Sequence, residues 1–153
     1  MRNMDCIFCK IIKGEIPSFK VWEDKEFLAM LDINPNTEGM TVLLSKKHYG
    51  SYLSEMPDDV YQRFWVAAKK VSRLLDKKLG TKRTAMVSEG MGVNHAHIKL
   101  YPLHGLGEKF QEMVPEKRVF YEMYPGFIDT KLGPKASLDD LKKLADKIKK
   151  AID

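Results

Sequence analysis

One long amphipathic helix, predicted over residues 58–79, is the feature that most constrains the fold. Its apolar residues recur at steps of three and four positions, which places them along one face of an α-helix. Gly80 comes next, where the end of a helix favours the left-handed backbone that glycine adopts easily. We therefore expect one continuous helix with the apolar positions Val60, Phe64, Ala67, Ala68, Val71, Leu74, Leu75 and Leu79.

Three short segments rich in β-branched and aromatic residues precede this helix, at 19–23, 26–31 and 40–44. Polar turn residues separate them at 24–25 and 34–36. Strand-like runs that alternate with polar turns are typical of antiparallel strands joined in sequence. The sequence therefore predicts that the fold opens with an antiparallel meander.

Two more segments of strand-like composition follow the helix, at 84–88 and 94–102. The turn between them, at 89–92, contains Gly90 and Gly92, which permit a close approach of the backbone to a ligand. The second of these strands carries two of the four histidines of the chain.

Beyond residue 103 the chain becomes irregular and rich in glycine and proline. An aromatic cluster at 120–124 is more typical of a core or a subunit contact than of an active site. Ser137 and Asp140 then offer a capping box for a last helix that we expect to end near residue 152.

The length of 153 residues, 44% of them hydrophobic, suits one sizeable core and is short for two. No repeat or linker divides the sequence, so we expect a single domain over 1–153, with a core at 5–103 and a C-terminal extension at 104–153. No stretch approaches the roughly 20 apolar residues that span a bilayer, and the first residues lack the apolar core of a signal peptide. A cytoplasmic location is therefore expected.

The formal net charge of +5 suits anionic ligands. Much of it comes from lysines and arginines at 69–83 and 142–150, where apolar residues are interspersed at helical spacing. This pattern favours solvated helix faces, so net charge alone does not argue for nucleic acid.

Alternate residues of the last predicted strand carry polar groups, with His95, His97 and Lys99 pointing to one face. The residues between them, Ala96, Ile98 and Leu100, are expected to face the core. Three cations on one face would repel one another, so packing alone does not explain this spacing. Taken in isolation, a His-x-His pair is compatible with a metal site, a catalytic site or chance.

Cys6 and Cys9 form a Cys-x-x-Cys pair near the N-terminus. In a reducing compartment such a pair indicates metal binding or redox chemistry rather than a structural disulfide. A redox dithiol and two small buried residues remain the alternatives to a metal site.

Several motifs in this sequence resemble the histidine-triad (HIT) superfamily, whose signature is His-φ-His-φ-His-φ-φ with φ apolar. The run from His95 to Leu100 resembles that signature, and further landmarks occur in family order. The resemblance covers about residues 5–103 and includes the segments at 6–18, 21–24, 31–35 and 44–48. It implies an α+β fold in which one long helix packs on a five-stranded antiparallel sheet, with a short N-terminal helix and an extra C-terminal helix. It also implies a homodimer.

In members of the family with the N-terminal cysteine pair, zinc is held by two cysteines and two histidines. The matching residues here are Cys6, Cys9, His48 and His95. Two thiolates and two imidazoles form a closed tetrahedral site, as a structural zinc requires.

The middle histidine of the family motif attacks the α-phosphorus of a nucleotide, and His97 occupies that position. Attack requires a neutral imidazole, and the nearby ammonium group of Lys99 is expected to lower the pKa of the ring. The resemblance therefore implies a nucleotide hydrolase or nucleotidyl transferase with a nucleotidyl-histidine intermediate. The implied substrate is a purine nucleotide derivative, such as a phosphoramidate or a dinucleoside polyphosphate.

The resemblance also implies which residues bind the nucleoside. Asp32 matches the acid that binds the ribose hydroxyls, since one carboxylate can accept both hydrogen bonds. The residues that match the apolar clamp around the base are Ile7, Phe8, Ile11, Met30, Leu31 and Ile33. For any one of them taken alone, an ordinary core position is favoured over the clamp, and only the whole pattern indicates a pocket.

This sequence departs from the family pattern at three places. Lys99 replaces the third histidine, Ser88 stands where many members have asparagine, and the phosphate-binding segment is reduced to Gly90-Met91-Gly92-Val93. We expect phosphate binding through backbone N–H groups, Ser88 and Lys99. His104 is interpreted as a loop histidine, with proton donation to a leaving group as the alternative.

Two other classes of function compete with the enzyme. One is a non-catalytic, zinc-stabilised nucleotide sensor or scaffold, which would bind nucleotide without turnover. The other is a nucleic-acid-binding zinc module, which needs a continuous basic surface, whereas the lysines here are dispersed. We expect no membrane partner and no nucleic acid.

Overall fold

The computed structural model describes residues 5–130 and 134–150. Two compact units are formed, by Met1–Phe110 and by Gln111–Asp153. The first unit holds all five strands found in the described residues, and the second holds the C-terminal helix. The single domain expected from the sequence stays a prediction.

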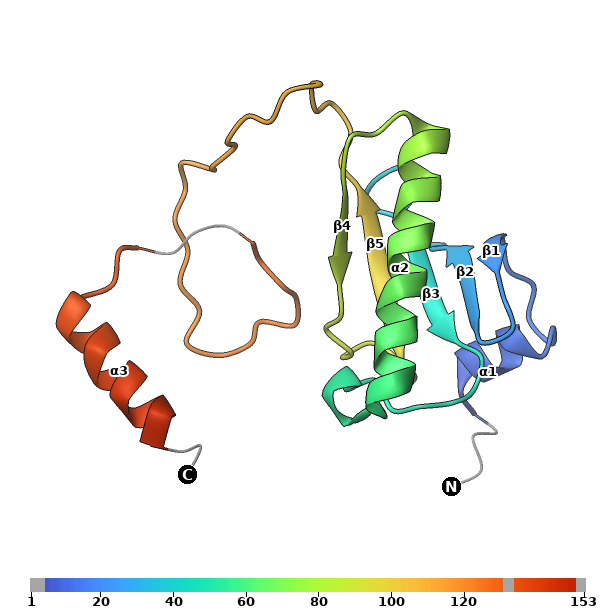
Figure 1. Cartoon of the computed structure of the whole chain (residues 1–153), viewed down its shortest axis with the longest axis horizontal. Coiled ribbons are helices and arrows are strands. Elements are labelled where there is room, and N and C mark those ends of the chain that lie inside the picture. The colour runs from blue at the N-terminus through green and yellow to red at the C-terminus, as the bar shows by residue number, and fades with distance from the viewer. Residues whose placement is uncertain (1–4, 131–133, 151–153) are drawn as a thin grey trace. The chain divides into compact units, whose positions relative to one another are not determined.

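The first unit is built on one sheet. Its strands are β1 (Lys20–Glu23), β2 (Phe27–Leu31), β3 (Thr41–Ser45), β4 (Thr84–Val87) and β5 (His97–Pro102). They lie in the order β1-β2-β3-β5-β4, and every neighbouring pair is antiparallel (Figure 1). The predicted five-stranded antiparallel sheet is confirmed.

The last strand begins three residues later than its composition predicts. Asn94 and Ala96 make hydrogen bonds to the turn that follows β3, and the carbonyl of Ala96 also accepts the N–H of Ser45 at 3.3 Å. The side-chain oxygen of Asn94 accepts the backbone N–H of Ser51 at 3.0 Å, and the N–H of Ala96 donates to the carbonyl of Tyr49 at 2.9 Å. His95 therefore lies in an irregular segment before β5, where its orientation depends on these contacts.

The long helix α2 (Asp58–Leu79) lies across one face of the sheet (Figure 1). Its apolar stripe packs on alternate strand residues, including Ala29, Leu43 and Ile98, each of which is fully buried. The helix ends at Gly80 in the left-handed conformation, with φ 70°, as the sequence predicts. A short 3-10 turn, η1 (Leu53–Glu55), precedes it.

The opposite face of the sheet is covered by the N-terminal helix α1 (Ile7–Ile12). Ile11 of α1 is buried in a separate apolar cluster with the strand residues Leu28, Met30, Val42 and Leu44. Successive residues of a strand point to opposite faces, so β2 and β3 are apolar on both sides. The sheet is therefore the middle layer between α2 and α1.

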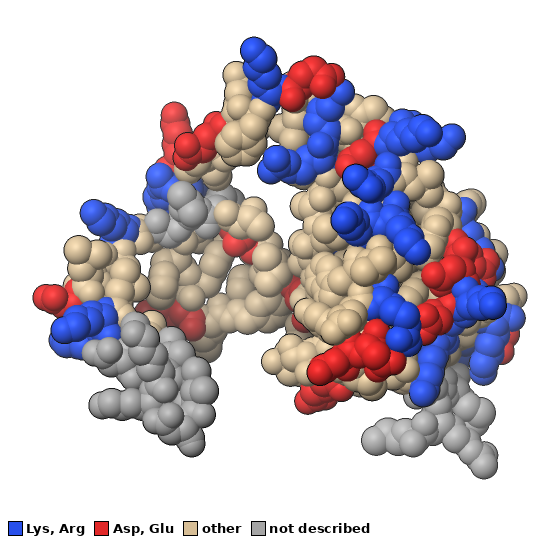
Figure 2. All heavy atoms as spheres, in the orientation of Figure 1, with Lys and Arg blue, Asp and Glu red and all other residues tan. Residues whose placement is uncertain are grey.

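Lysine and arginine side chains gather over the C-terminal part of α2, and acidic side chains lie nearer its N-terminal end (Figure 2). Lys69, Lys70, Arg73, Lys77 and Lys78 are all exposed. They form the solvated helix face that the spacing of charges predicts.

The second unit contains irregular chain and the helix α3 (Leu138–Lys150). The backbone N–H of Asp140 donates to Oγ of Ser137, which confirms the predicted N-terminal cap, whereas the expected end near residue 152 lies outside the described residues. The aromatic cluster at 120–124 does not form a core, since Phe120 and Met123 are exposed. No helix within the described parts of the chain is both long and apolar enough to cross a membrane.

Candidate functional site

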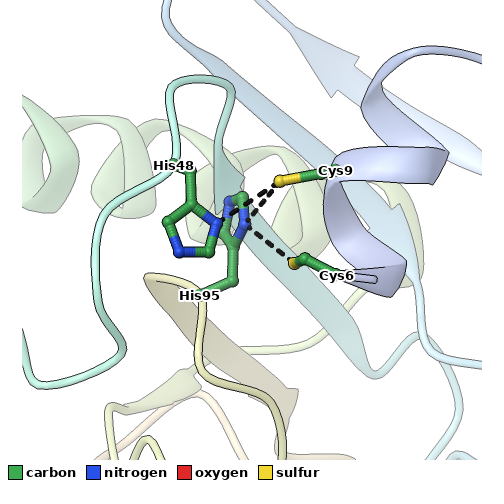
Figure 3. Close-up of side chains that lie close together, drawn as sticks. All are labelled: Cys6, Cys9, His48 and His95. Atoms are coloured by element: carbon green, nitrogen blue, oxygen red, sulfur yellow. Dashed lines mark hydrogen bonds between the residues drawn. The ribbon is translucent and has the colours of Figure 1, made fainter. Parts of the chain in front are cut away.

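Four side chains that could ligate a metal ion meet at the edge of α1 (Figure 3). Cys6 and Cys9 come from the start and the first turn of α1, His48 from the turn after β3, and His95 from the segment before β5. Their donor atoms all lie within 4.8 Å of one another. Residues far apart in sequence are thus gathered by the sheet and α1 into one cluster, the Cys/His quartet.

The distances within the quartet suit a small tetrahedral ion. Sγ of Cys9 lies 3.3 Å from Nδ1 of His48, and Sγ of Cys6 lies 3.4 Å from Nδ1 of His95. Zinc–ligand bonds of about 2.0–2.3 Å place neighbouring donors of a tetrahedron roughly 3.3–3.8 Å apart. The four residues therefore fit a structural metal of the zinc type in both chemistry and spacing.

The His95 ring is oriented by a main-chain group. Its Nε2–H donates to the carbonyl of Ser45 at 2.7 Å, so in the neutral ring Nδ1 carries the lone pair that faces the cysteine sulfurs. A ligating histidine commonly has such a partner on its other nitrogen. Burial lowers the pKa of His95, which favours the neutral, metal-binding form.

His97, the first residue of β5, is oriented in a different way. Its Nδ1–H donates to the main-chain carbonyl of His95 at 2.7 Å, which leaves Nε2 unprotonated in the neutral ring. The side chain is only 4% exposed, and this burial is the main cause that lowers the pKa of His97. The hydrogen bond to His95 raises this pKa, while the charge of Lys99 lowers it, as expected. A buried imidazole with one free nitrogen is suited to act as a nucleophile.

A model of the HIT domain family matches residues 13–106. The chain belongs to the HIT family. An uncharacterized HIT-like protein of Methanocaldococcus jannaschii is 46% identical over 71% of this chain and 88% of its own length. The adenosine 5′-monophosphoramidase of Candida albicans is 45% identical over 65% of this chain and 71% of its own length. An adenylylsulfatase of Arabidopsis thaliana is 33% identical over 64% of this chain and 52% of its own length.

Solved structures of HIT proteins share this fold. A protein of Streptococcus mutans superposes with a TM-score of 0.71 and 30% identity, covering 98% of this chain and 87% of its own. A Zn-bound histidine triad family protein of Mycobacterium smegmatis superposes with a TM-score of 0.60 and 26% identity, covering 71% of this chain and 81% of its own. The α+β HIT-like fold expected from the sequence is confirmed.

The apolar residues matched to the HIT base clamp do not all lie on one side of the sheet. Ile11 of α1 and Met30 of β2 are buried where the helix packs on the sheet, and the half-buried ring of Phe8 packs on the same cluster. Ile7 and Ile33 are exposed. Leu31 follows Met30 along β2 and so points to the other face, the one that α2 covers.

Asp32, matched to the ribose-binding acid of HIT proteins, lies just after β2. It is half-buried, and its Oδ1 accepts the backbone N–H of Asn34 at 2.7 Å. This local turn holds the carboxylate in place while the second oxygen retains its capacity to accept hydrogen bonds.

The loop matched to the HIT phosphate-binding segment is held against residue 51. Gly90 adopts φ +76°, and a Cβ at this position would lie 2.6 Å from the carbonyl oxygen of Ser51. Gly92 has open space around it, Ser88 is exposed and Val93 is half-buried. The close approach predicted for the glycines therefore occurs at Gly90, toward the chain's own backbone.

His104 lies beyond the end of β5 that is remote from His97. Its Nε2–H donates to the carbonyl of Glu38 at 2.9 Å, and the residue is exposed. Five strand residues of about 3.3 Å each separate His97 from the end of β5. This distance favours the loop interpretation of His104 over proton donation at His97.

Two features of the site were missed from the sequence. Tyr101 continues the alternation of His97 and Lys99 on the same face, and burial together with the charges of Asp32 and Glu89 raises its pKa. Its position two residues beyond Lys99 could have indicated this from the sequence. The hydrogen bond between Asn94 and Ser51 could not be predicted from the sequence, because the two residues are distant along the chain.

Proposed function

We propose that this HIT chain hydrolyses, or transfers the nucleotidyl group of, a purine nucleotide derivative such as a phosphoramidate or a dinucleoside polyphosphate. One observation carries the proposal: the Nδ1–H of His97 donates to the carbonyl of His95 at 2.7 Å, so Nε2 keeps its lone pair. The activities named for the similar proteins of Candida albicans and Arabidopsis thaliana support this class of substrate.

In the proposed reaction, Nε2 of His97 attacks the α-phosphorus. The new phosphorus–nitrogen bond forms as the bond to the leaving group breaks, and the leaving group departs with a proton taken from water. Water then attacks the phosphorus of the nucleotidyl-histidine, which breaks the bond to His97, releases the nucleotide and returns a proton to solvent. Lys99 is a half-buried residue two positions along the same strand face, and its ammonium group stabilises the negative charge of the transition state.

The proposed nucleotide site extends from His97 over the α1 side of the sheet. Asp32 accepts the ribose hydroxyls, and the backbone of the loop with Ser88, Gly90, Gly92 and Val93 binds the phosphate. The base packs on the apolar residues matched to the HIT clamp, Ile7, Phe8, Ile11, Met30 and Ile33, whereas the side chain of Leu31 points to the opposite face of the sheet.

We also propose that zinc binds the Cys/His quartet. The support is the spacing of its donor atoms and the similar Zn-bound protein of Mycobacterium smegmatis. When bound, zinc supplies a structural cross-link between α1, the turn after β3 and the segment before β5. Elemental analysis of protein purified without added metal is expected to find one zinc per chain.

Trapping the covalent intermediate tests the proposed chemistry. Adenosine and guanosine phosphoramidates carrying a labelled α-phosphate are mixed with the protein and quenched in base, where phosphorus–nitrogen bonds to histidine persist. Label is expected on His97 of the wild type and is expected to be absent from the His97→Asn variant. If the wild type shows no label and no turnover across a panel of nucleotides, the proposed enzymatic function is overturned.

A non-catalytic nucleotide sensor or scaffold is the second candidate, and Lys99 at the third triad position favours it. A sensor binds nucleotide with equal affinity in the wild type and in His97→Asn and turns over none in either form. Isothermal titration of both proteins therefore separates the two functions. Light scattering of the same samples tests the homodimer implied by the family.

A further inference from the structure

The aromatic ring of Phe8 contacts the rings of both His95 and His97. Its centroid lies 5.8 Å from that of His95 at an interplanar angle of 90°, and 5.5 Å from that of His97 at 69°. Both are edge-to-face arrangements, which aromatic rings favour. Phe8 thus bridges the candidate nucleophile and a candidate metal ligand.

The surroundings of Phe8 fix which side of His97 it occupies. His97 pairs with Leu44 across β3 and β5, and Leu44 belongs to the buried cluster on which Phe8 packs. Phe8 and His97 therefore share the α1 face of the sheet. The imidazole is enclosed by the ring of Phe8 on this face and by the main chain of His95 at Nδ1.

The position of Phe8 in turn depends on the Cys/His quartet. A helix of six residues such as α1 has no stability of its own, so tertiary contacts hold it in place. Phe8 lies between Cys6 and Cys9, whose sulfurs contact His95 at 3.4 and 3.5 Å. A metal bound there would restrain the backbone on both sides of Phe8.

We propose that Phe8 is a positioning residue for His97, and that a metal in the quartet keeps Phe8 in place. Rotation about the last side-chain torsion of histidine is broad and roughly two-fold, so a loosely packed ring can turn Nδ1–H away from its acceptor. The ring of Phe8 blocks that rotation and holds Nε2 as the free nitrogen. Only the expected change in kcat rests on the proposed function, whereas the orientation of His97 does not depend on it.

A role in positioning differs from a role in the base clamp. A residue that only contacts the base in both ground and transition states changes KM and leaves kcat intact. A residue that orients the nucleophile changes kcat. An edge-to-face pair corresponds to about a three- to tenfold preference for one ring orientation, so kcat of Phe8→Leu is expected to fall by about that factor.

The experiment uses the full chain loaded with zinc, labelled with ¹⁵N in histidine. The Nδ1–H of His97 is expected to give a protected imidazole proton signal in the wild type. In Phe8→Leu that signal is expected to lose most of its intensity through exchange with water. Phe8→Tyr retains the aromatic ring and is expected to restore both the signal and kcat.

Ile12→Val is the matched control, because Ile12 lies on the same helix and packs on the same apolar cluster. It is expected to keep the His97 signal, kcat and KM. Circular dichroism and zinc content verify that each variant is folded. Wild-type protein stripped of zinc by a chelator is expected to show the weakened His97 signal of Phe8→Leu.

A Phe8→Leu protein that keeps the His97 signal, keeps kcat and only raises KM would overturn the positioning role. A chelated wild type with an unchanged His97 signal would overturn the role of the metal in it. If the wild type shows no turnover, the proposed function fails, and the imidazole signal still decides whether Phe8 orients His97.

Discussion

The main-chain carbonyl of His95 accepts the Nδ1–H of His97 at 2.7 Å, while the ring of the same His95 faces the sulfurs of Cys6 and Cys9. One residue therefore serves both parts of the site. Its side chain belongs to the Cys/His quartet, and its backbone selects the nitrogen of His97 that remains free. The proposed metal ligand and the proposed nucleophile therefore lie only two residues apart along the chain.

Metal removal is expected to destabilise the protein. An ion bound only by the folded state adds about 4 kcal/mol when its free concentration is 1,000 times the dissociation constant. A chelator should therefore lower the thermal midpoint of the wild type. Cys9→Ser removes one thiolate, so its thermal midpoint without chelator should lie below that of the wild type. The chelator should then change this midpoint very little. Equal midpoints for the wild type with and without chelator would contradict a structural metal.

Replacing Lys99 by methionine is expected to lower kcat by about 10²–10³-fold, the loss typical of a group that stabilises transition-state charge. Lys99→Arg keeps a positive charge and should retain most of the activity. Steady-state kinetics on an adenosine phosphoramidate measure both variants. If Lys99→Met turns over substrate as fast as the wild type, Lys99 has no electrostatic role in the reaction.

Gly90→Ala is expected to destabilise the loop before β5. At φ +76° a side chain costs about 1–2 kcal/mol, and its Cβ would lie 2.6 Å from the carbonyl oxygen of Ser51. Gly92→Ala is the control for stability, because a Cβ there meets no atom within 4 Å. Thermal unfolding should separate the two variants, and similar midpoints would show that the loop relaxes without cost.

Asp76 is expected to stabilise the connection between α2 and β4. Its Oδ1 accepts hydrogen bonds from Oγ1 of Thr81 at 2.7 Å and of Thr84 at 2.8 Å. Asp76→Ala leaves both hydroxyls without this acceptor and should cost about 1–3 kcal/mol in urea unfolding. Asp76→Asn keeps an oxygen at this position and should lose less. Equal losses in the two variants would assign the effect to charge rather than to these hydrogen bonds.

Much of the fold follows from local patterns in the sequence. The steps of three and four residues between Val60 and Leu79 determine the apolar face of α2, and the alternation from Ala96 to Leu100 determines which strand side chains enter the core. Both patterns depend only on near neighbours along the chain. The resemblance to the HIT motifs also allowed the candidate metal ligands and His97 to be predicted from the sequence.

The tertiary structure decided what depends on contacts between distant residues. The sulfur of Cys9 meets His48 and His95 only because α1 packs on the sheet and the turn after β3 lies beside the start of β5. The free nitrogen of His97 is selected by a backbone carbonyl, and the side chain of Leu31 is directed away from Met30 by the pleat of β2. Residue types determine which groups are available, whereas chain packing determines which of those groups meet.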